Sequence, residues 1–141
     1  MSDILHRIQI EARPETVYDA ITTSEGLSTW WTSDSAHERK IGSVAEFGFH
    51  NRAMVFRMRV AELQPGKRVM WECQGDDPEW KGTRISFDLT PKDGGTLVNF
   101  KHSEWRSVEK GYPSCNTVWG YLMHTLKSYS EGKPTEPYFD A

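Results

Sequence analysis

The sequence predicts an α+β protein of the helix-grip type. In this fold a curved antiparallel β-sheet of about six strands wraps around a long C-terminal α-helix, with two short helices after the first strand. Three observations predict it. Apolar residues alternate with a period of two in several segments. Turn signals separate those segments, which indicates consecutive antiparallel hairpins. Near the C-terminus the period becomes helical with one heavily apolar face, which must be buried against the sheet.

The first predicted elements are a strand and a helix. Residues 4–11 alternate in polarity, so that Ile8 and Ile10 share one face of a strand. Pro14 then suits the first position of a helix, where its missing N–H and its fixed φ are tolerated. The apolar stripe of that helix consists of Val17, Tyr18 and Ile21.

A second, short helix is expected next, with Ser24 as its N-cap. It carries Leu27, Trp30 and Trp31. Adjacent residues on a helix diverge by about 100°, so the two Trp side chains should not both point into the core. One of them is expected to line an opening at the rim of the sheet. Residues 32–42 are polar and are interpreted as a loop.

Strands return after Gly42, where the period is again two. Residues 64–67 place Pro and Gly where a type II turn requires them, and so join two strands into a hairpin. Residues 76–80 form a loop in which Trp80 is expected to be exposed and to close a mouth. A turn at 93–95 precedes the last strand. The residues expected on buried strand faces are Ala45, Phe47, Phe49, Met54, Phe56, Met58, Val60, Val69, Trp71, Cys73, Ile85, Phe87, Leu89, Val98, Phe100 and His102.

The last predicted element is a helix whose apolar face is centred on Leu122. Gly132 and Pro134 end it. The chain from about residue 133 is expected to be the tail of one domain that spans residues 1–141. His124 lies on the opposite side of the helix and is predicted to be solvated. The other residues of the apolar face are Cys115, Val118, Trp119, Leu126 and Tyr129.

Composition and charge exclude several classes of function. Few aliphatic side chains are offset by 6 Trp, 5 Tyr and 6 Phe, which predicts an ordered core built from rings. With a formal net charge of -3, the chain lacks the excess of Lys and Arg that is typical of nucleic-acid-binding proteins. Without an apolar run of membrane-spanning length or a signal peptide, we expect a cytoplasmic protein that contacts neither nucleic acid nor membrane. Cys73 and Cys115 have no metal or redox spacing, and we expect both to be reduced and buried.

The search for catalytic and metal-binding motifs yields no site. The sequence has no Gly-rich phosphate loop, no nucleophile elbow and no zinc-binding His pair, and its five His show no ligand spacing. We therefore assign no catalytic residue, no metal and no cofactor. Arg57 and Arg59 alternate with buried residues and are interpreted as part of a solvated outer face, with Arg84 as a neighbour.

Five segments resemble the START-like, Bet v 1-like (SRPBCC) superfamily, and within it the family named after the activator of heat-shock-protein-90 ATPase. They are residues 14–22 (PETVYDAIT), 27–31 (LSTWW), 82–91 (GTRISFDLTP), 95–102 (GTLVNFKH) and 119–129 (WGYLMHTLKSY). The resemblance runs from about residue 4 to 131. It implies a hydrophobic cavity between the long helix and the curved sheet, in which members bind lipids, sterols, polyketides or other apolar molecules. Some members are cyclases or hydrolases.

Aromatic side chains would form the walls of such a cavity. His102 is the candidate polar residue, because it shares a strand face with Val98 and Phe100. It either bonds another side chain, contacts a ligand or transfers a proton. The alternative is that the rings fill the core and leave no cavity. The candidate ligand-pocket residues are Trp30, Trp31, Phe47, Phe49, Met58, Trp71, Trp80, Phe87, Phe100, His102, Trp119 and Met123.

Three functions are compatible with these observations. The preferred one is binding of a small hydrophobic molecule, such as a lipid, a polyketide or an aromatic metabolite, which His102 would orient. The second, implied by the resemblance, is a co-chaperone-like regulator of a heat-shock ATPase. The third is a cyclase or hydrolase that uses His102 or Glu104 as acid or base in the same cavity. No enzymatic activity is assigned, and a protein partner is not indicated.

Overall fold

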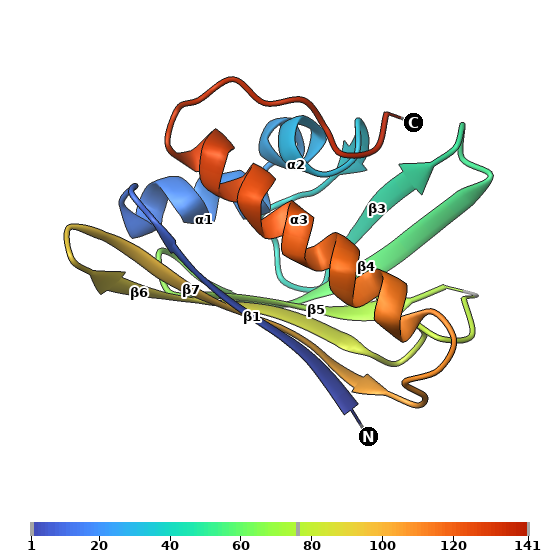
Figure 1. Cartoon of the computed structure of the whole chain (residues 1–141). Coiled ribbons are helices and arrows are strands. Elements are labelled where there is room, and N and C mark those ends of the chain that lie inside the picture. Colours follow the sequence, from blue (N-terminus) through green and yellow to red (C-terminus); the bar gives the residue numbers. More distant parts are fainter. Residues whose placement is uncertain (1, 76, 141) are drawn as a thin grey trace.

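A computed structural model of the chain describes residues 2–75 and 77–140 and has the predicted helix-grip fold (Figure 1). The elements are β1 (Ser2–Ile10), α1 (Pro14–Thr22), α2 (Ser24–Trp30), β2 (Asp34–Ala36), β3 (Val44–Phe49), β4 (Met54–Gln64), β5 (Arg68–Gln74), β6 (Arg84–Lys92), β7 (Gly95–Trp105) and α3 (Tyr112–Ser130). All three helices lie on the same side of one curved sheet. Asp76, in the loop predicted for residues 76–80, lies outside the described residues.

The sheet has the order β1-β7-β6-β5-β4-β3-β2, with antiparallel neighbours. The described part of the chain thus forms seven strands rather than about six. The additional strand, β2, corrects the interpretation of residues 32–42 as a loop. In its pairing with β3, Asp34 lies opposite Gly48, and a Cβ on Gly48 would lie 2.1 Å from the Asp34 carboxylate. β2 is therefore defined by its pairing with β3, which its own polar sequence does not reveal.

The N-cap of α2 is Thr23 and not Ser24, contrary to the prediction. The Oγ1 atom of Thr23 accepts a hydrogen bond from the backbone N–H of Gly26 at 3.0 Å. Ser24 is the first helical residue, and its hydroxyl accepts from the backbone N–H of His37 at 2.9 Å. Both side chains are competent caps, so a tertiary contact with the segment after β2 decides between them.

Other local predictions are confirmed. Pro14 is the first residue of α1. In the turn between β4 and β5, the backbone N–H of Lys67 donates to the carbonyl of Gln64 at 2.8 Å. Gly66 has a φ of 70°, which the third residue of a type II turn requires. The residues that α1 buries include Val17, Tyr18 and Ile21.

The core consists mainly of aromatic rings, as the composition predicts. The ring of Trp31 is central, with its centroid 4.4 Å from that of Phe47 and 5.2 Å from that of Trp119. Rings of this size supply much of the buried apolar area that the few aliphatic side chains cannot. Among the strand residues expected inside, Met54 is exposed, because it lies at the hairpin end of β4. The rings exposed by at most 2% belong to Trp30, Trp31, Phe47, Trp71, Phe87, Phe100, Trp105 and Trp119.

Helix α3 lies across the concave face of the sheet (Figure 1). Its last residue is Ser130, and Gly132 follows with a φ of 79°, a conformation that favours glycine after a helix. His124 is exposed, as predicted. No helix among the described residues is long and apolar enough to cross a membrane. The residues that α3 buries are Trp119, Leu122, Met123, Leu126 and Ser130.

The segment after α3 folds back over the helices toward β2 and β3 (Figure 1). The backbone N–H of Phe139 donates to the carbonyl of Trp31 at 2.8 Å, and the N–H of Ser33 donates to the carbonyl of Phe139 at 2.9 Å. The ring of Phe139 packs edge-on against Phe49, with centroids 4.9 Å apart. The expected tail is therefore a packed part of the fold.

Ion pairs cover the outer face of the sheet. Arg57 and Arg59 each pair with a Glu on a neighbouring strand, with N–O distances of 3.4 and 3.0 Å. Arg84 pairs with Glu104 at 3.4 Å. These side chains are about a third to a half exposed, so the pairs contribute little to stability. Glu104, one of the two candidate acid–base residues, is engaged on this outer face.

Candidate functional site

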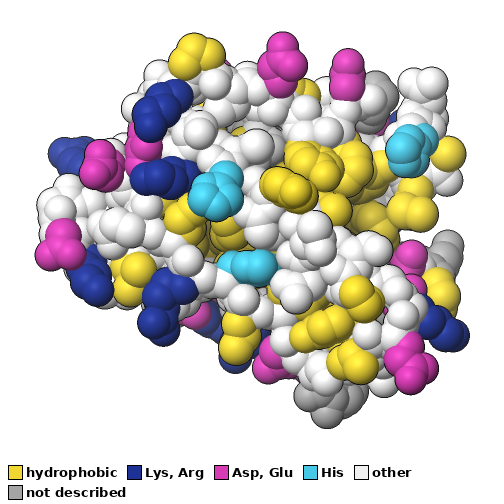
Figure 2. All heavy atoms as spheres, in the orientation of Figure 1, with side chains coloured by type: hydrophobic (Ala, Val, Ile, Leu, Met, Phe, Trp, Pro, Cys, Tyr) yellow, Lys and Arg dark blue, Asp and Glu magenta, His cyan; other side chains and the backbone are white. Residues whose placement is uncertain are grey.

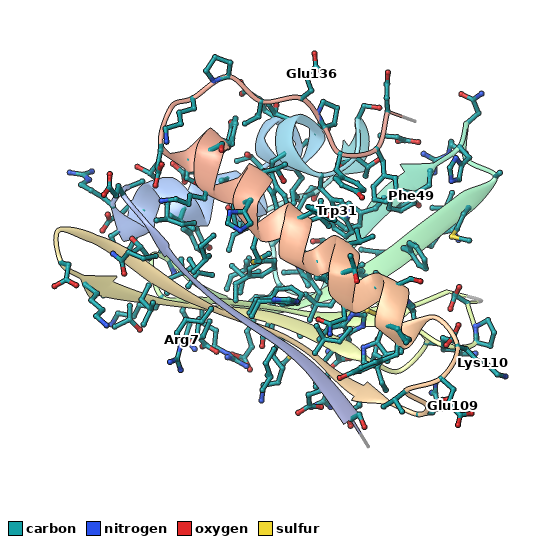
Figure 3. All side chains as sticks on the ribbon, viewed as in Figure 1. Arg7, Trp31, Phe49, Glu109, Lys110 and Glu136 are labelled. Atoms are coloured by element: carbon teal, nitrogen blue, oxygen red, sulfur yellow. The ribbon has the colours of Figure 1, made fainter. Side chains whose placement is uncertain are left out.

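An apolar cavity of about 180 Å³ lies between α3, the hairpin of β3 and β4, and the segment after α3. Figure 2 shows hydrophobic side chains gathered in a hollow on this face of the molecule. Figure 3 shows two of the lining residues, Trp31 and Phe49, between α3 and β3. The lining residues are Trp31, Phe49, His50, Phe56, Trp80, Ser114, Cys115, Val118, Trp119, Leu122 and Phe139.

The two adjacent Trp residues at the end of α2 have different roles. Trp31 lines the cavity. Trp30 does not, and its indole N–H donates to the backbone carbonyl of Ala20 at 2.8 Å. Contrary to the prediction, both rings are buried in the core, and they lie nearly parallel at 19°. The 100° divergence does not apply, because α2 ends at Trp30 and Trp31 has non-helical backbone angles.

Trp80 is only 8% exposed, which corrects the prediction of an exposed ring. The Oδ1 atom of Asp77 accepts hydrogen bonds from the backbone N–H groups of Glu79 and Trp80, at 2.9 and 3.0 Å. This local turn carries the Trp80 ring inward. There it stacks on Phe56, with centroids 4.1 Å apart, and lies 6.3 Å from the ring of Trp119. Trp80 is thus a wall of the cavity.

His102 lies behind this wall and does not line the cavity. Its ring is fully buried, and both nitrogens have protein partners. The indole N–H of Trp119 donates to Nδ1 at 3.2 Å, and Nε2 is 2.8 Å from the Oγ1 atom of Thr83. Burial lowers the pKa of His102 to about 3, so the imidazole is neutral at physiological pH. The interpretation of His102 as a residue bonded to other side chains fits this geometry best.

A second buried histidine, His37, is outside the cavity, and no sequence pattern singles it out. The indole N–H of Trp71 donates to its Nε2 at 3.1 Å. Burial, with a smaller effect from Arg39, lowers the pKa of His37 to about 4. Each of the two buried histidines therefore accepts from a Trp of the core. The described residues contain no group of three or more His, Cys, Asp or Glu that could hold a metal ion.

Exposed polar groups lie at the mouth of the cavity. His50 opens a turn of three consecutive residues with positive φ (54°, 56° and 65°). Arg52 anchors this turn through ion pairs with Asp34 at 2.8 Å and Glu46 at 2.7 Å. From the first turn of α3, Ser114 also reaches the cavity.

Both cysteines are free thiols, but only one of them is fully buried. Cys73 lies in the sheet, where burial raises its pKa to about 12. Cys115 is half-buried in the cavity wall, and burial also raises its pKa. The expectation that both are buried is therefore wrong for Cys115.

Four of the candidate pocket residues line the cavity: Trp31, Phe49, Trp80 and Trp119. The other candidates pack in the closed core beneath it, because the cavity occupies one end of the concave face rather than its whole length. They are Trp30, Phe47, Met58, Trp71, Phe87, Phe100, His102 and Met123.

The residues that the sequence prediction omitted from the lining are of two kinds: those on a face with a recognisable period and those without a periodic signal. The helical face of α3 had already identified Cys115, Val118 and Leu122 as inward-facing, so their roles could have been derived. Phe139 follows the end of the last helix and has no periodic signal. The lining residues absent from the prediction are His50, Phe56, Ser114, Cys115, Val118, Leu122 and Phe139.

Comparison with known proteins gives a consistent family and fold. A family model described as "Activator of Hsp90 ATPase homolog 1-like protein" matches residues 11–131. A solved structure of an Aha1 dimer from Colwellia psychrerythraea is 38% identical, with a TM-score of 0.85, and the match covers 93% of this chain and 97% of that chain. Comparison with curated proteins found no match.

More distant structures share the fold. A protein from Mesorhizobium loti is 20% identical, with a TM-score of 0.79 and coverage of 90% of this chain and 95% of that one. DynU16, from the dynemicin biosynthetic locus, is 18% identical, with a TM-score of 0.80. That match covers 100% of this chain and 51% of DynU16. These two matches show that the fold is shared.

Proposed function

We propose that this chain, which belongs to the family of Activator of Hsp90 ATPase homolog 1-like proteins, binds a small apolar molecule in the cavity beside α3. The cavity itself carries the proposal. Protein interiors are close-packed, with few voids larger than a water molecule. The cavity of about 180 Å³ has apolar aromatic walls and a few polar groups at its mouth, which is the chemical character of small-molecule sites.

The contacts around the cavity support binding rather than catalysis. Both nitrogens of His102 are bonded to other side chains, and Glu104 is paired with Arg84 on the outer face. No carboxylate lines the cavity among the described residues. The raised pKa of Cys115 keeps its sulfur as a thiol, which is a weaker nucleophile than a thiolate. Within the described lining, no hydrogen bond joins a nucleophile to a base, as covalent catalysis would require.

A titration tests the proposal. Apolar metabolites and lipids are added to isotope-labelled protein while backbone amide shifts are recorded. A bound molecule should shift the amides of Trp31, Phe49 and Trp119, which surround the cavity, and leave those of the outer strand faces unchanged. The amides of Arg7 and Asp88, which lie on the outer strand faces and are not next in sequence to any lining residue, serve as internal controls. If no ligand class perturbs the cavity residues, the proposal is wrong.

A second candidate function is regulation of a heat-shock ATPase. The observations that favour it are the description of the matching family model, which names an activator of Hsp90 ATPase, and the 38% identity to the Aha1 dimer over nearly the whole length of both chains. The test is an ATPase assay with the heat-shock protein of the host, supplemented by this chain in increasing amounts. Stimulation that saturates supports the function, and an unchanged rate rejects it. Sedimentation of the same samples shows whether the chain is itself a dimer.

A further inference from the structure

The volume of the cavity limits what it can hold. At about 180 Å³ it is close to apolar cavities of about 150 Å³ that hold one benzene molecule. It is smaller than the roughly 300–1,000 Å³ of sites that enclose drug-sized ligands. A sterol or a long acyl chain would need space behind Trp31 and Trp119, where buried rings are packed against one another. The cavity therefore matches a single ring in size.

The walls favour a flat aromatic group over an aliphatic one. Phe56 and Trp80 are stacked at 18°, whereas Phe49 and Phe139 meet edge-on at 87°. The lining thus presents ring faces and ring edges, and aromatic pairs in both arrangements gain energy beyond the area that they bury. Six lining residues are aromatic: Trp31, Phe49, Phe56, Trp80, Trp119 and Phe139.

Polarity is confined to the outer end of the cavity. Trp31, Trp119 and Leu122 are at most 2% exposed and form the inner end. His50 and Ser114 are exposed and form the outer end. An imidazole and a hydroxyl can each donate a hydrogen bond to a ligand oxygen. A ligand that fits this gradient has an apolar ring and a polar substituent that points outward.

We infer that the cavity selects a one-ring aromatic molecule with a hydroxyl-type substituent, its ring against Trp31 and its oxygen beside His50. This inference rests on the proposed function, because it specifies the ligand of the same cavity. It excludes lipids and sterols as ligands at this site.

Three probes test the inference: phenol, toluene and dodecanoate. Phenol and toluene have nearly the same shape and differ in the hydroxyl group, and dodecanoate is a linear chain. We expect phenol to shift the amides of Trp31 and Trp119 and to bind more tightly than toluene, and dodecanoate to leave these amides unchanged. Val118→Phe fills the cavity from α3 and should weaken phenol binding by about tenfold or more. The matched control is Val108→Phe, at an exposed valine outside the lining, which should have no effect.

A variant at the protein surface tests the contact with the ligand's hydroxyl group and leaves the core unaltered. His50→Ala should weaken phenol binding by about fivefold and leave toluene binding unchanged, because only phenol offers an oxygen to the imidazole. His124→Ala, an exposed histidine outside the cavity, should change neither affinity. If His50→Ala weakens both ligands equally or neither of them, the assigned role of His50 is wrong.

The outcomes separate this inference from the proposed function. If dodecanoate shifts the cavity amides and phenol does not, the one-ring inference is overturned and the proposed function stands. If Val118→Phe leaves phenol binding intact, phenol binds elsewhere and the inference is again overturned. If none of the probes and none of the wider apolar panel shifts these amides, both are wrong.

Discussion

The indole N–H of Trp119 donates a hydrogen bond to Nδ1 of His102 over 3.2 Å. An indole nitrogen only donates, so Nδ1 must accept, and the proton of the neutral imidazole is on Nε2. Nε2 then donates to Thr83, whose hydroxyl donates to the carbonyl of Trp80 at 2.6 Å. One buried histidine thereby connects two of the Trp residues that line the cavity, Trp119 from α3 and Trp80 from the loop between β5 and β6.

Removing this histidine should destabilise the protein strongly. His102→Ala leaves a buried space and deprives the Trp119 N–H of its acceptor, so we expect the free energy of unfolding to fall by about 2–5 kcal/mol. Urea denaturation measures the change. His124→Ala, at an exposed histidine of α3, should stay within about 0.5 kcal/mol of the unmodified protein. Equal stability of the two variants would show that the hydrogen-bond chain contributes nothing.

The buried histidines should also make stability depend on pH. Burial lowers the pKa of His102 to about 3 and that of His37 to about 4, from 6.5. Below pH 6.5 the unfolded state therefore binds more protons than the folded state. The stability that the neutral rings confer is complete above pH 6.5 and is lost as the pH falls toward 4 and then 3.

Urea denaturation at several values between pH 6.5 and 5 measures this effect. Each group contributes a slope of up to about 1.4 kcal/mol per pH unit, so the free energy of unfolding should fall by up to about 3 kcal/mol per unit. His37→Gln removes one titrating group and should reduce the slope by about half. A slope that is the same in this variant contradicts the assignment of His37.

Phe139 should stabilise the fold through its contact with Phe49. Its ring is half-buried, so Phe139→Ala should lower the free energy of unfolding by about 1–3 kcal/mol, less than for a fully buried Phe. Phe139 and Trp31 line the same cavity, so the loss of the Phe139 ring should expose the Trp31 indole. Acrylamide should then quench the Trp fluorescence more strongly. Glu136→Ala, in the same segment but exposed (Figure 3), is the control and should change neither quantity. Unchanged quenching in Phe139→Ala would mean that this ring does not cover the cavity.

Gly48 should be required because of its contact with Asp34. A Cβ at this position would lie 2.1 Å from the Asp34 carboxylate, so Gly48→Ala must push this side chain away from its ion pair with Arg52 and is expected to cost about 1–3 kcal/mol. Asp34→Ala alone removes a partly exposed ion pair and should cost about 1 kcal/mol or less. The double variant should be more stable than Gly48→Ala, since the clash is gone. Additive losses in denaturation experiments would argue against this contact.

The part of the candidate site on α3 could be predicted from the sequence, and the part formed by loops could not. Val118 and Leu122 follow a helical period that is visible in the chain itself. Trp80 enters the wall because Asp77 turns its loop inward, and loop residues carry no period that shows their direction. Phe139 reaches the cavity only because backbone bonds to Trp31 and Ser33 hold the last segment. Such bonds join residues more than a hundred positions apart.

By itself the sequence determined the order and type of nearly all the elements, because alternation, helical stripes and turn residues act between close neighbours in the chain. It also determined that the core would be built from rings. Only the tertiary structure decided that β2 pairs, that Trp80 is buried and that His102 stands behind the cavity rather than in it. The position and size of a cavity depend on how the shapes of all the packed rings fit together, and no local pattern encodes that fit.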